Sequence, residues 1–243
     1  MSRRSLFVTL GLVVFLVGGA GLLLFLVVGY EPEVYSQAVV PAGEARSQMS
    51  QEFLKEFSTL LSAPEAERDW YVMFSDEQIN SYLDEGFINE GLASRVLPEG
   101  VSHPHVVFGP EKVHLAFRYG VGGWNTVISI DLRAWLAKGE PNAVALELEG
   151  FRAGALPISG QWLLEEFVKA GRDKSGMDVT WYRTNGHPVA LLRFQADQPH
   201  PSMLLQGVQI QQKLLTIRGR SPESVSLNSL FRLPGLALKP IED

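Results

Sequence analysis

Three histidines in this 243-residue sequence have a spacing that could bind a metal ion, namely His103, His105 and His114. The alternation of apolar residues predicts that they lie on two strands of a hairpin, in which Val107 faces His114. His105 is then diagonal to His114, with His103 further along the same face, and three imidazoles on one face suit a metal. The opposite face of both strands carries apolar side chains, so the histidine face is expected to be solvated. We therefore predict no metal site.

Other signatures of catalysis are missing from the sequence. Ser159-Gly160 lacks the pattern of a nucleophile elbow and is placed to cap a helix. Glu165-Glu166 falls at the solvated edge of a predicted helix, whereas general acid–base catalysis needs a buried carboxylate pair. Gly120-x-Gly122 lacks the third glycine and the helix of a phosphate loop, and HExxH and Walker motifs are absent. We predict neither an enzymatic activity nor a cofactor.

The charge balance and the absence of cysteine exclude further classes of function. Of the 21 Lys and Arg residues, only Arg3 and Arg4 lie in the first thirty positions, which contain no acidic residue. Residues 31–243 therefore hold 19 basic against 27 acidic residues, a net charge of −8. Because no basic cluster is present, nucleic acid is not an expected partner. Without cysteine, disulfides, thiolate zinc sites and a cysteine nucleophile are excluded.

Residues 6–29 form an uncharged run of 24 residues. As a helix this run spans about 36 Å, enough for a hydrocarbon core of about 30 Å. The alternative is a cleaved signal peptide, but its apolar region normally stops after about 7 to 15 residues. Two arginines precede the run, whereas Glu31 and Glu33 follow it. The positive-inside bias therefore predicts a single-pass protein of the cell membrane with a cytoplasmic N-terminus and an extracytoplasmic domain.

The sequence divides into four parts on this basis. They are an N-terminal cytoplasmic stub and transmembrane anchor (1–30), a juxtamembrane linker (31–43), an extracytoplasmic α+β domain (44–220) and a proline-containing C-terminal tail (221–243).

Three amphipathic helices are predicted after the anchor. Apolar residues at helical spacing indicate a helix over residues 44–61, ended by Pro64. A second helix begins with the capping box Ser75–Gln78 and stops near Gly86. A third is expected over residues 159–170, after an N-cap serine. The first helix is expected to pack on its own domain, and a stalk or partner-binding helix is the alternative.

From residue 101 onward the apolar residues alternate along the chain. Four alternating segments separated by turns predict an antiparallel meander between residues 101 and 149. Asn185-Gly186 joins residues 179–184 and 189–196 as a hairpin, and residues 204–218 are typical of a long or broken strand. The predicted fold class is α+β: an N-terminal transmembrane helix followed by a curved antiparallel sheet covered by amphipathic helices.

Five aromatic residues are candidates for a ligand or partner surface. Phe53 and Phe57 share one stripe of the first predicted helix of the domain. Trp124 lies beside a glycine turn, Trp135 near a strand end and Trp162 on the third helix. Such rings can contact a partner or a lipid headgroup layer. The alternative is ordinary packing in the core and at sheet edges.

The stretch LELEGFRAGALPISGQWLLEEF, residues 146–167, runs from a strand through a glycine and Leu156-Pro157 into a helix. Together with the N-terminal span, FSDEQINSYL at 74–83 and the paired strands at 106–118, it resembles the YpmS-type family of membrane-anchored bacterial proteins of unknown function. It is more loosely similar to tubular (TULIP-like) lipid-binding domains. The resemblance covers about half of the chain and leaves out residues 171–243. It implies a membrane-anchored envelope domain and carries over no catalytic residue.

Two functions remain open from the sequence. The domain binds a lipid or other apolar ligand at the cell envelope, or it is a structural or assembly protein that docks another envelope membrane protein. Because the domain is acidic, it mildly repels anionic headgroups, so any lipid contact has to come from apolar surface. The sequence does not decide whether the sheet encloses an apolar groove or a solid core.

Overall fold

The computed structural model describes residues 3–66, 69–159, 178–184, 186–194 and 203–221 of the chain. The predicted features that lie outside these residues are Trp162, Glu165-Glu166, the third helix and the tail beyond Ser221. The side chain of Trp124 is also outside the described part.

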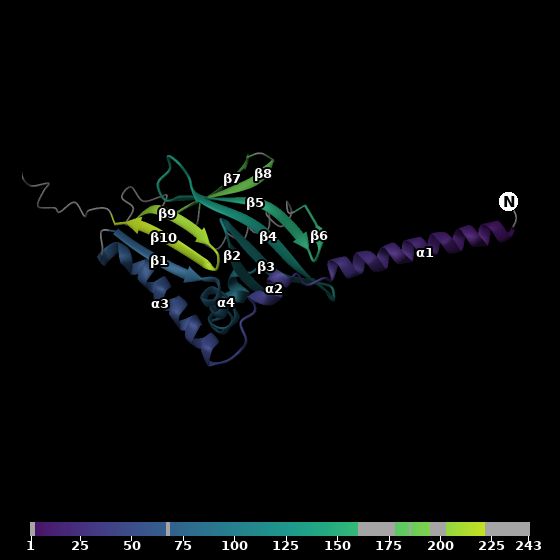
Figure 1. The fold of residues 1–243 in the computed structure, drawn as a ribbon, viewed down its shortest axis with the longest axis horizontal. Helices are drawn as coiled ribbons and strands as arrows, with labels where there is room; N and C mark the ends of the chain where they lie inside the picture. The colour runs from purple at the N-terminus through teal and green to yellow at the C-terminus, as the bar shows by residue number, and fades with distance from the viewer. Residues whose placement is uncertain (1–2, 67–68, 160–177, 185, 195–202, 222–243) are drawn as a thin grey trace, which may run out of the picture.

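The fold class is α+β, as predicted: apart from β1, the described helices come first in the chain and the antiparallel strands follow (Figure 1). The elements are, in chain order, α1 (Arg3–Val28), α2 (Glu33–Ala38), α3 (Glu44–Ala66), β1 (Asp69–Ser75), α4 (Asp76–Asp84), α5 (Gly86–Asn89), α6 (Leu92–Val96), β2 (Val101–Gly109), β3 (Lys112–Val121), β4 (Trp124–Leu136), β5 (Ala143–Ala153), β6 (Leu156–Pro157), β7 (Asp178–Thr184), β8 (His187–Arg193), β9 (Leu204–Gln211) and β10 (Leu214–Arg220).

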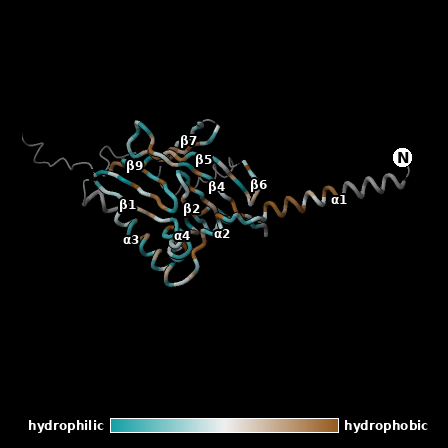
Figure 2. The backbone as a smooth tube through the Cα atoms, viewed as in Figure 1, coloured by the Kyte–Doolittle hydropathy of each residue, from teal (hydrophilic) through white to brown (hydrophobic). Residues whose placement is uncertain are grey.

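The first helix stands apart from the rest of the molecule. Figure 1 shows α1 projecting from one end of the domain, and Figure 2 shows that the coloured part of α1 consists largely of hydrophobic residues. The side chains of Phe15, Leu22 and Phe25 are each more than half exposed, so they do not pack on the domain. Over the described residues, this is the one helix whose length and composition suffice to cross a membrane.

The predicted meander is confirmed, as part of a larger sheet. Strands β2 to β5 pair consecutively and antiparallel, and the hairpin of β7 and β8 adds to β5, giving the order β2-β3-β4-β5-β8-β7. The predicted register is also confirmed, since Val107 lies opposite His114. Gly122 and Gly123 form the β3–β4 turn with positive φ angles of 62° and 91°, which glycine adopts without strain.

A second, three-stranded sheet was not predicted. Its order is β1-β10-β9, so residues 204–218 are not one strand but a hairpin broken at Gln212 and Lys213. β1 follows α3 directly, and its side chains alternate between buried and exposed. The prediction of a single sheet was therefore wrong, because β1 pairs with a strand far along the chain.

The first two helices predicted for the domain, α3 and α4, largely match their predicted positions, whereas the short helices α2, α5 and α6 were not predicted. Ser75 caps α4 in a capping box with Gln78, as predicted, and α4 ends at Asp84 before the short helix α5. Pro64 does not end α3, which continues to Ala66, two residues beyond the proline. α3 packs on α4 and β1.

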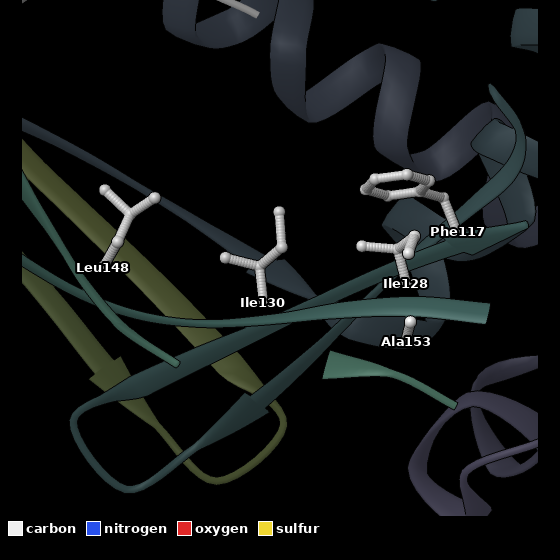
Figure 3. Packing of buried hydrophobic residues seen from close by; sticks show 5 residues of the cluster. All are labelled: Phe117, Ile128, Ile130, Leu148 and Ala153. Carbon is white, nitrogen blue, oxygen red and sulfur yellow. The ribbon is translucent and has the colours of Figure 1, made fainter. Parts of the chain in front are cut away.

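The main core lies on one face of the large sheet. Phe117, Ile128, Ile130, Leu148 and Ala153 from β3, β4 and β5 form one buried cluster (Figure 3). Trp181 and Ile158 pack against this cluster. At about 25 cal/mol per Å² of buried apolar surface, such clusters supply most of the driving force for folding.

Helix α4 closes the free edge of the large sheet at β2. The Asn80 side chain donates to the Val106 carbonyl at 2.7 Å and accepts from the Val106 N–H at 2.8 Å. Asp76 accepts from the Phe108 N–H at 3.4 Å. Side chains of α4 therefore replace the backbone partners of a neighbouring strand, which protects β2 from pairing with another chain.

Candidate functional site

The end of α1 is bonded to the large sheet. The Thr126 hydroxyl of β4 donates to the Val28 carbonyl at 2.6 Å, and the Ala155 N–H donates to the Val27 carbonyl at 2.9 Å. The last carbonyls of a helix lack partners within the helix, and these two bonds satisfy them, with the Tyr30 N–H as a second, longer donor to Val27 at 3.4 Å. We call this set of contacts the junction.

Gly154 allows the junction to form. Its φ of +58° lies in the left-handed region, and a Cβ there would lie 2.5 Å from the Val28 carbonyl oxygen and closer still to that of Val27. Both neighbours are backbone atoms, which cannot rotate away. The position therefore requires glycine for its conformation and for its lack of a side chain.

The segment after α1 is also held against the domain. Tyr35 of α2 is 2% exposed, packs with Ala116 and Val127, and donates its hydroxyl to the His103 carbonyl at 3.1 Å. Burial raises the pKa of Tyr35. Glu31 pairs with Arg118 at 3.1 Å. The stretch predicted as a linker thus contains a packed helix in its first half.

A groove of about 860 Å³ lies between the segment that follows α2, helix α4 and the β2–β3 turn. One wall is a run of small apolar residues, Ala38, Val39, Val40, Pro41 and Ala42. The groove has the size of a small-molecule site, for which a mostly apolar lining is usual. We refer to it as the apolar-walled groove.

The titratable groups on the other side of this groove are occupied by protein partners. Glu77 pairs with Lys213 at 2.9 Å, which raises the pKa of Lys213, and Asp76 bonds to the β2 backbone. His114 bonds to Asp131 at 2.7 Å. These groups fix the walls of the groove, and the apolar run supplies much of the remaining contact surface, next to Gln37 and Glu44.

The three histidines do not form one cluster. His103 has a φ of +48° and lies in a bulge of β2 that breaks the register between Ser102 and His105. His105 contacts Asp84 of α4 at 3.0 Å, and His114 contacts Asp131 of β4. Among the residues that the structure describes, no group of three or more His, Cys, Asp or Glu is arranged to hold a metal.

The expectation that the histidine face is solvated was wrong at His105, which is 2% exposed. Its ring meets the ring of Tyr35 at a centroid distance of 5.1 Å in an edge-on arrangement. Helix α2 covers this end of the face and Asp84 supplies the polar partner. Neither contact has a local sequence signal, because both partners come from other elements.

Charged side chains alternate across the solvated part of the same face. Asp131 accepts from His114 and lies 3.3 Å from Arg152, and Glu149 pairs with Lys112 at 2.6 Å. The His114 hydrogen bond lowers the pKa of Asp131, with the Arg152 charge acting the same way against burial. The bond to Lys112 lowers the pKa of Glu149. Carboxylates kept ionised in this way suit a structural ion-pair ladder better than general acid catalysis.

The candidate aromatic residues divide between packing and exposure. Phe53 stacks on Tyr82 at 4.9 Å and contacts Phe74 at 5.4 Å, so it joins α3 to the domain. Phe57 is 42% exposed. Trp135 packs against a second buried cluster of the large sheet, which consists of Ala143, Ala145, Val189 and Leu191.

Sequence reasoning missed the residues that build the junction. Thr126 and Gly154 gave no signal of their own, although Gly154 belongs to the strand–glycine–Leu-Pro unit within residues 146–157. Comparison of the chain with protein-family models, with curated proteins and with solved structures finds no match in any of the three.

Proposed function

We propose that this chain is a single-pass membrane protein whose extracytoplasmic α+β domain is non-catalytic and binds a lipid or other apolar ligand. The observation that carries the proposal is the junction, because it makes an apolar helix of membrane-spanning length part of the folded domain. A signal peptide is removed from the mature protein and is not expected to complete its fold. We also propose that the YpmS-type resemblance reflects common descent, which the order of β5, Gly154 and β6 supports.

The orientation can be tested in cells, because the chain has no cysteine of its own. Glu140 lies in the exposed β4–β5 turn, and Ser2 precedes α1. A membrane-impermeant maleimide is expected to label Glu140→Cys in intact cells and Ser2→Cys only after permeabilisation. The reverse pattern, or release of the Glu140→Cys protein from washed membranes, contradicts the proposed topology.

The apolar-walled groove is the proposed ligand site. Its volume fits part of an acyl chain, and its wall of Ala, Val and Pro offers contact without hydrogen-bonding groups. Burying apolar surface contributes about 25 cal/mol per Å². The acidic charge of the domain does not attract anionic lipid, so the ligand is recognised by its apolar part.

The groove can be tested with a photoactivatable lipid. The full chain is placed in phosphatidylcholine nanodiscs that contain a phosphatidylcholine with a diazirine on one acyl chain, and crosslinked peptides are mapped by mass spectrometry. Crosslinks are expected in α1, which serves as the internal reference, and in residues 38–45. Val107→Trp is expected to fill the groove and to remove the crosslinks in residues 38–45 while leaving those in α1.

A matched variant controls for the added ring. Leu54→Trp places the same side chain on the exposed face of α3, away from the groove, and is expected to leave both sets of crosslinks unchanged. Crosslinks confined to α1 in the unmodified protein, or unaffected by Val107→Trp, contradict lipid binding in the groove.

The second candidate function, docking of another membrane protein, is favoured by the exposure of Phe57 and Leu54 on α3. Phe53 packs on Tyr82 within the domain, whereas Phe57 is 42% exposed and stacks only on the edge of this cluster, with its ring 5.8 Å from that of Phe53. Of the two, Phe57 is therefore the position at which a substitution removes less packing. Crosslinking in cells is expected to lose a specific partner in Phe57→Ser if this function holds, and Thr59→Ala on the same exposed stretch serves as the control. An unchanged crosslinking pattern in Phe57→Ser contradicts docking through this surface.

A further inference from the structure

We infer that the domain rests on the bilayer surface through two uncharged loops beside the end of α1. They are the β3–β4 turn with its flanks (residues 120–126) and the β5–β6 loop (residues 153–158), together called the rim. This inference rests on the proposed function, because it requires that α1 spans the membrane.

The junction sets the depth of the rim. The apolar run of residues 6–29 is about 36 Å long, about 6 Å more than the hydrocarbon core. The carbonyls of Val27 and Val28 therefore lie near the membrane boundary. Thr126 and Ala155 are hydrogen-bonded to them at 2.6 and 2.9 Å, so these two residues of the rim lie within a few Å of the same depth.

The turns of the large sheet differ in charge between its two ends. In an antiparallel meander, successive turns lie at opposite ends of the strands. The β3–β4 turn and the β5–β6 loop lie at the end near α1 (Figure 1), and residues 120–126 and 153–158 contain no charged residue. The turns at the far end carry Glu111 and Lys112, and Lys138 and Glu140.

This difference is what a membrane surface requires. At the chain average of 20% charged residues, the thirteen residues of the rim would hold about two or three charges, and they hold none. Gly122, Gly123, Ala155 and Pro157 are exposed there, so the absence of charge does not reflect burial in the domain. Exposed uncharged residues meet a headgroup layer with less loss of hydration than charged ones.

Two arginines lie behind the rim. Arg118 lies two strand residues before residue 120, or roughly 6.6 Å along the strand, and Arg152 directly precedes residue 153. Both side chains are about half exposed, although each has a carboxylate partner, Glu31 and Asp131 respectively. Guanidinium groups within a few Å of the membrane boundary are placed to bind lipid phosphates. The occupant of the rim is therefore a phospholipid surface.

Spin labels at single cysteines test the inference in the full chain. Asn125→Cys and Ala155→Cys report the rim, Glu140→Cys the far end and Leu23→Cys the helix. The protein is reconstituted into vesicles of phosphatidylcholine and phosphatidylglycerol, and accessibility to oxygen and to a water-soluble nickel chelate is measured. The rim labels are expected to lose nickel accessibility relative to Glu140→Cys and to gain oxygen accessibility.

The outcomes separate this inference from the anchoring itself. If the Leu23 label lies in the bilayer while the rim labels are as accessible to nickel as the Glu140 label, the inference is wrong and the anchoring stands. If the Leu23 label is itself in water, both are wrong. Adding Ala155→Asp to Asn125→Cys is expected to restore nickel accessibility at residue 125, whereas Ala137→Asp at the far end is not.

Discussion

Replacing Gly154 by alanine is expected to detach α1 from the domain. The added Cβ would lie 2.5 Å from the Val28 carbonyl oxygen, well inside contact distance. The left-handed conformation costs a non-glycine residue about 1–2 kcal/mol. Relief of the clash requires that the helix end moves away, which loses the bonds from Thr126 and Ala155, worth about 1 kcal/mol each. The junction then opens while the domain stays folded.

Gly91→Ala is the matched control for this change. Gly91 has a φ of +69°, close to that of Gly154, but a Cβ at this position would meet no atom within 4 Å beyond its own chain neighbours. Both variants therefore lose the same about 1–2 kcal/mol to backbone strain. Only Gly154→Ala loses the junction, so a difference between the two measures the junction alone.

The assay is the distance between two nitroxides, one on Leu23→Cys and one on Glu140→Cys, measured by pulsed electron paramagnetic resonance in nanodiscs. Both side chains are exposed, so the labels do not disturb packing. A narrow distance distribution is expected for the unmodified background and for Gly91→Ala, and a broad one for Gly154→Ala. A narrow, unshifted distribution in Gly154→Ala would refute the reasoning that the junction fixes the helix on the domain.

Three further changes test the fold around the site. Gly219→Ala is expected to lower the free energy of unfolding by about 2–3 kcal/mol, seen as a lower urea midpoint, because its Cβ would overlap the buried ring of Trp70; an unchanged midpoint contradicts this packing. Asp131→Asn is expected to lower the free energy of unfolding by about 1 kcal/mol at pH 7 and by less near pH 3, since a carboxylate with a lowered pKa contributes stability above about pH 4 that is lost progressively as the pH falls. Equal losses at both pH values in urea titrations would show that the bond to His114 does not supply this stability. Asn80→Ala is expected to lower the free energy of unfolding by about 2 kcal/mol, because it removes the side chain that pairs with the backbone of β2 at the sheet edge. The exposed edge is also expected to promote self-association, seen in sedimentation. A variant that stays monomeric with an unchanged urea midpoint contradicts that role.

Features with local causes could be predicted from the sequence. The capping box at Ser75 and Gln78 joins residues three apart, and the meander follows from alternation within each strand. The register of His114 opposite Val107 follows from the length of one turn. In each case the partners lie within a few residues or across one hairpin, so periodicity and turn residues determine the structure.

Features built by distant segments could not be predicted. β1 pairs with β10, and its alternating pattern is too short to specify a partner strand. His105 is buried because Tyr35 and Asp84 converge on it from α2 and α4. The junction requires Gly154 to lie against the end of α1, a contact that spans more than a hundred residues. Tertiary packing decides these positions, and local patterns carry no information about it.

The small sheet also sets the order in which the nascent chain can finish folding. Asp69 of β1 pairs with Arg220, 151 residues later. At about 5–20 residues per second, β10 is synthesised roughly 8–30 s after β1. Over that interval the buried residues of β1, Trp70, Val72 and Phe74, can be covered by α3, which is already made. Early docking of α3 is therefore what shields an apolar strand from aggregation while the ribosome completes the chain.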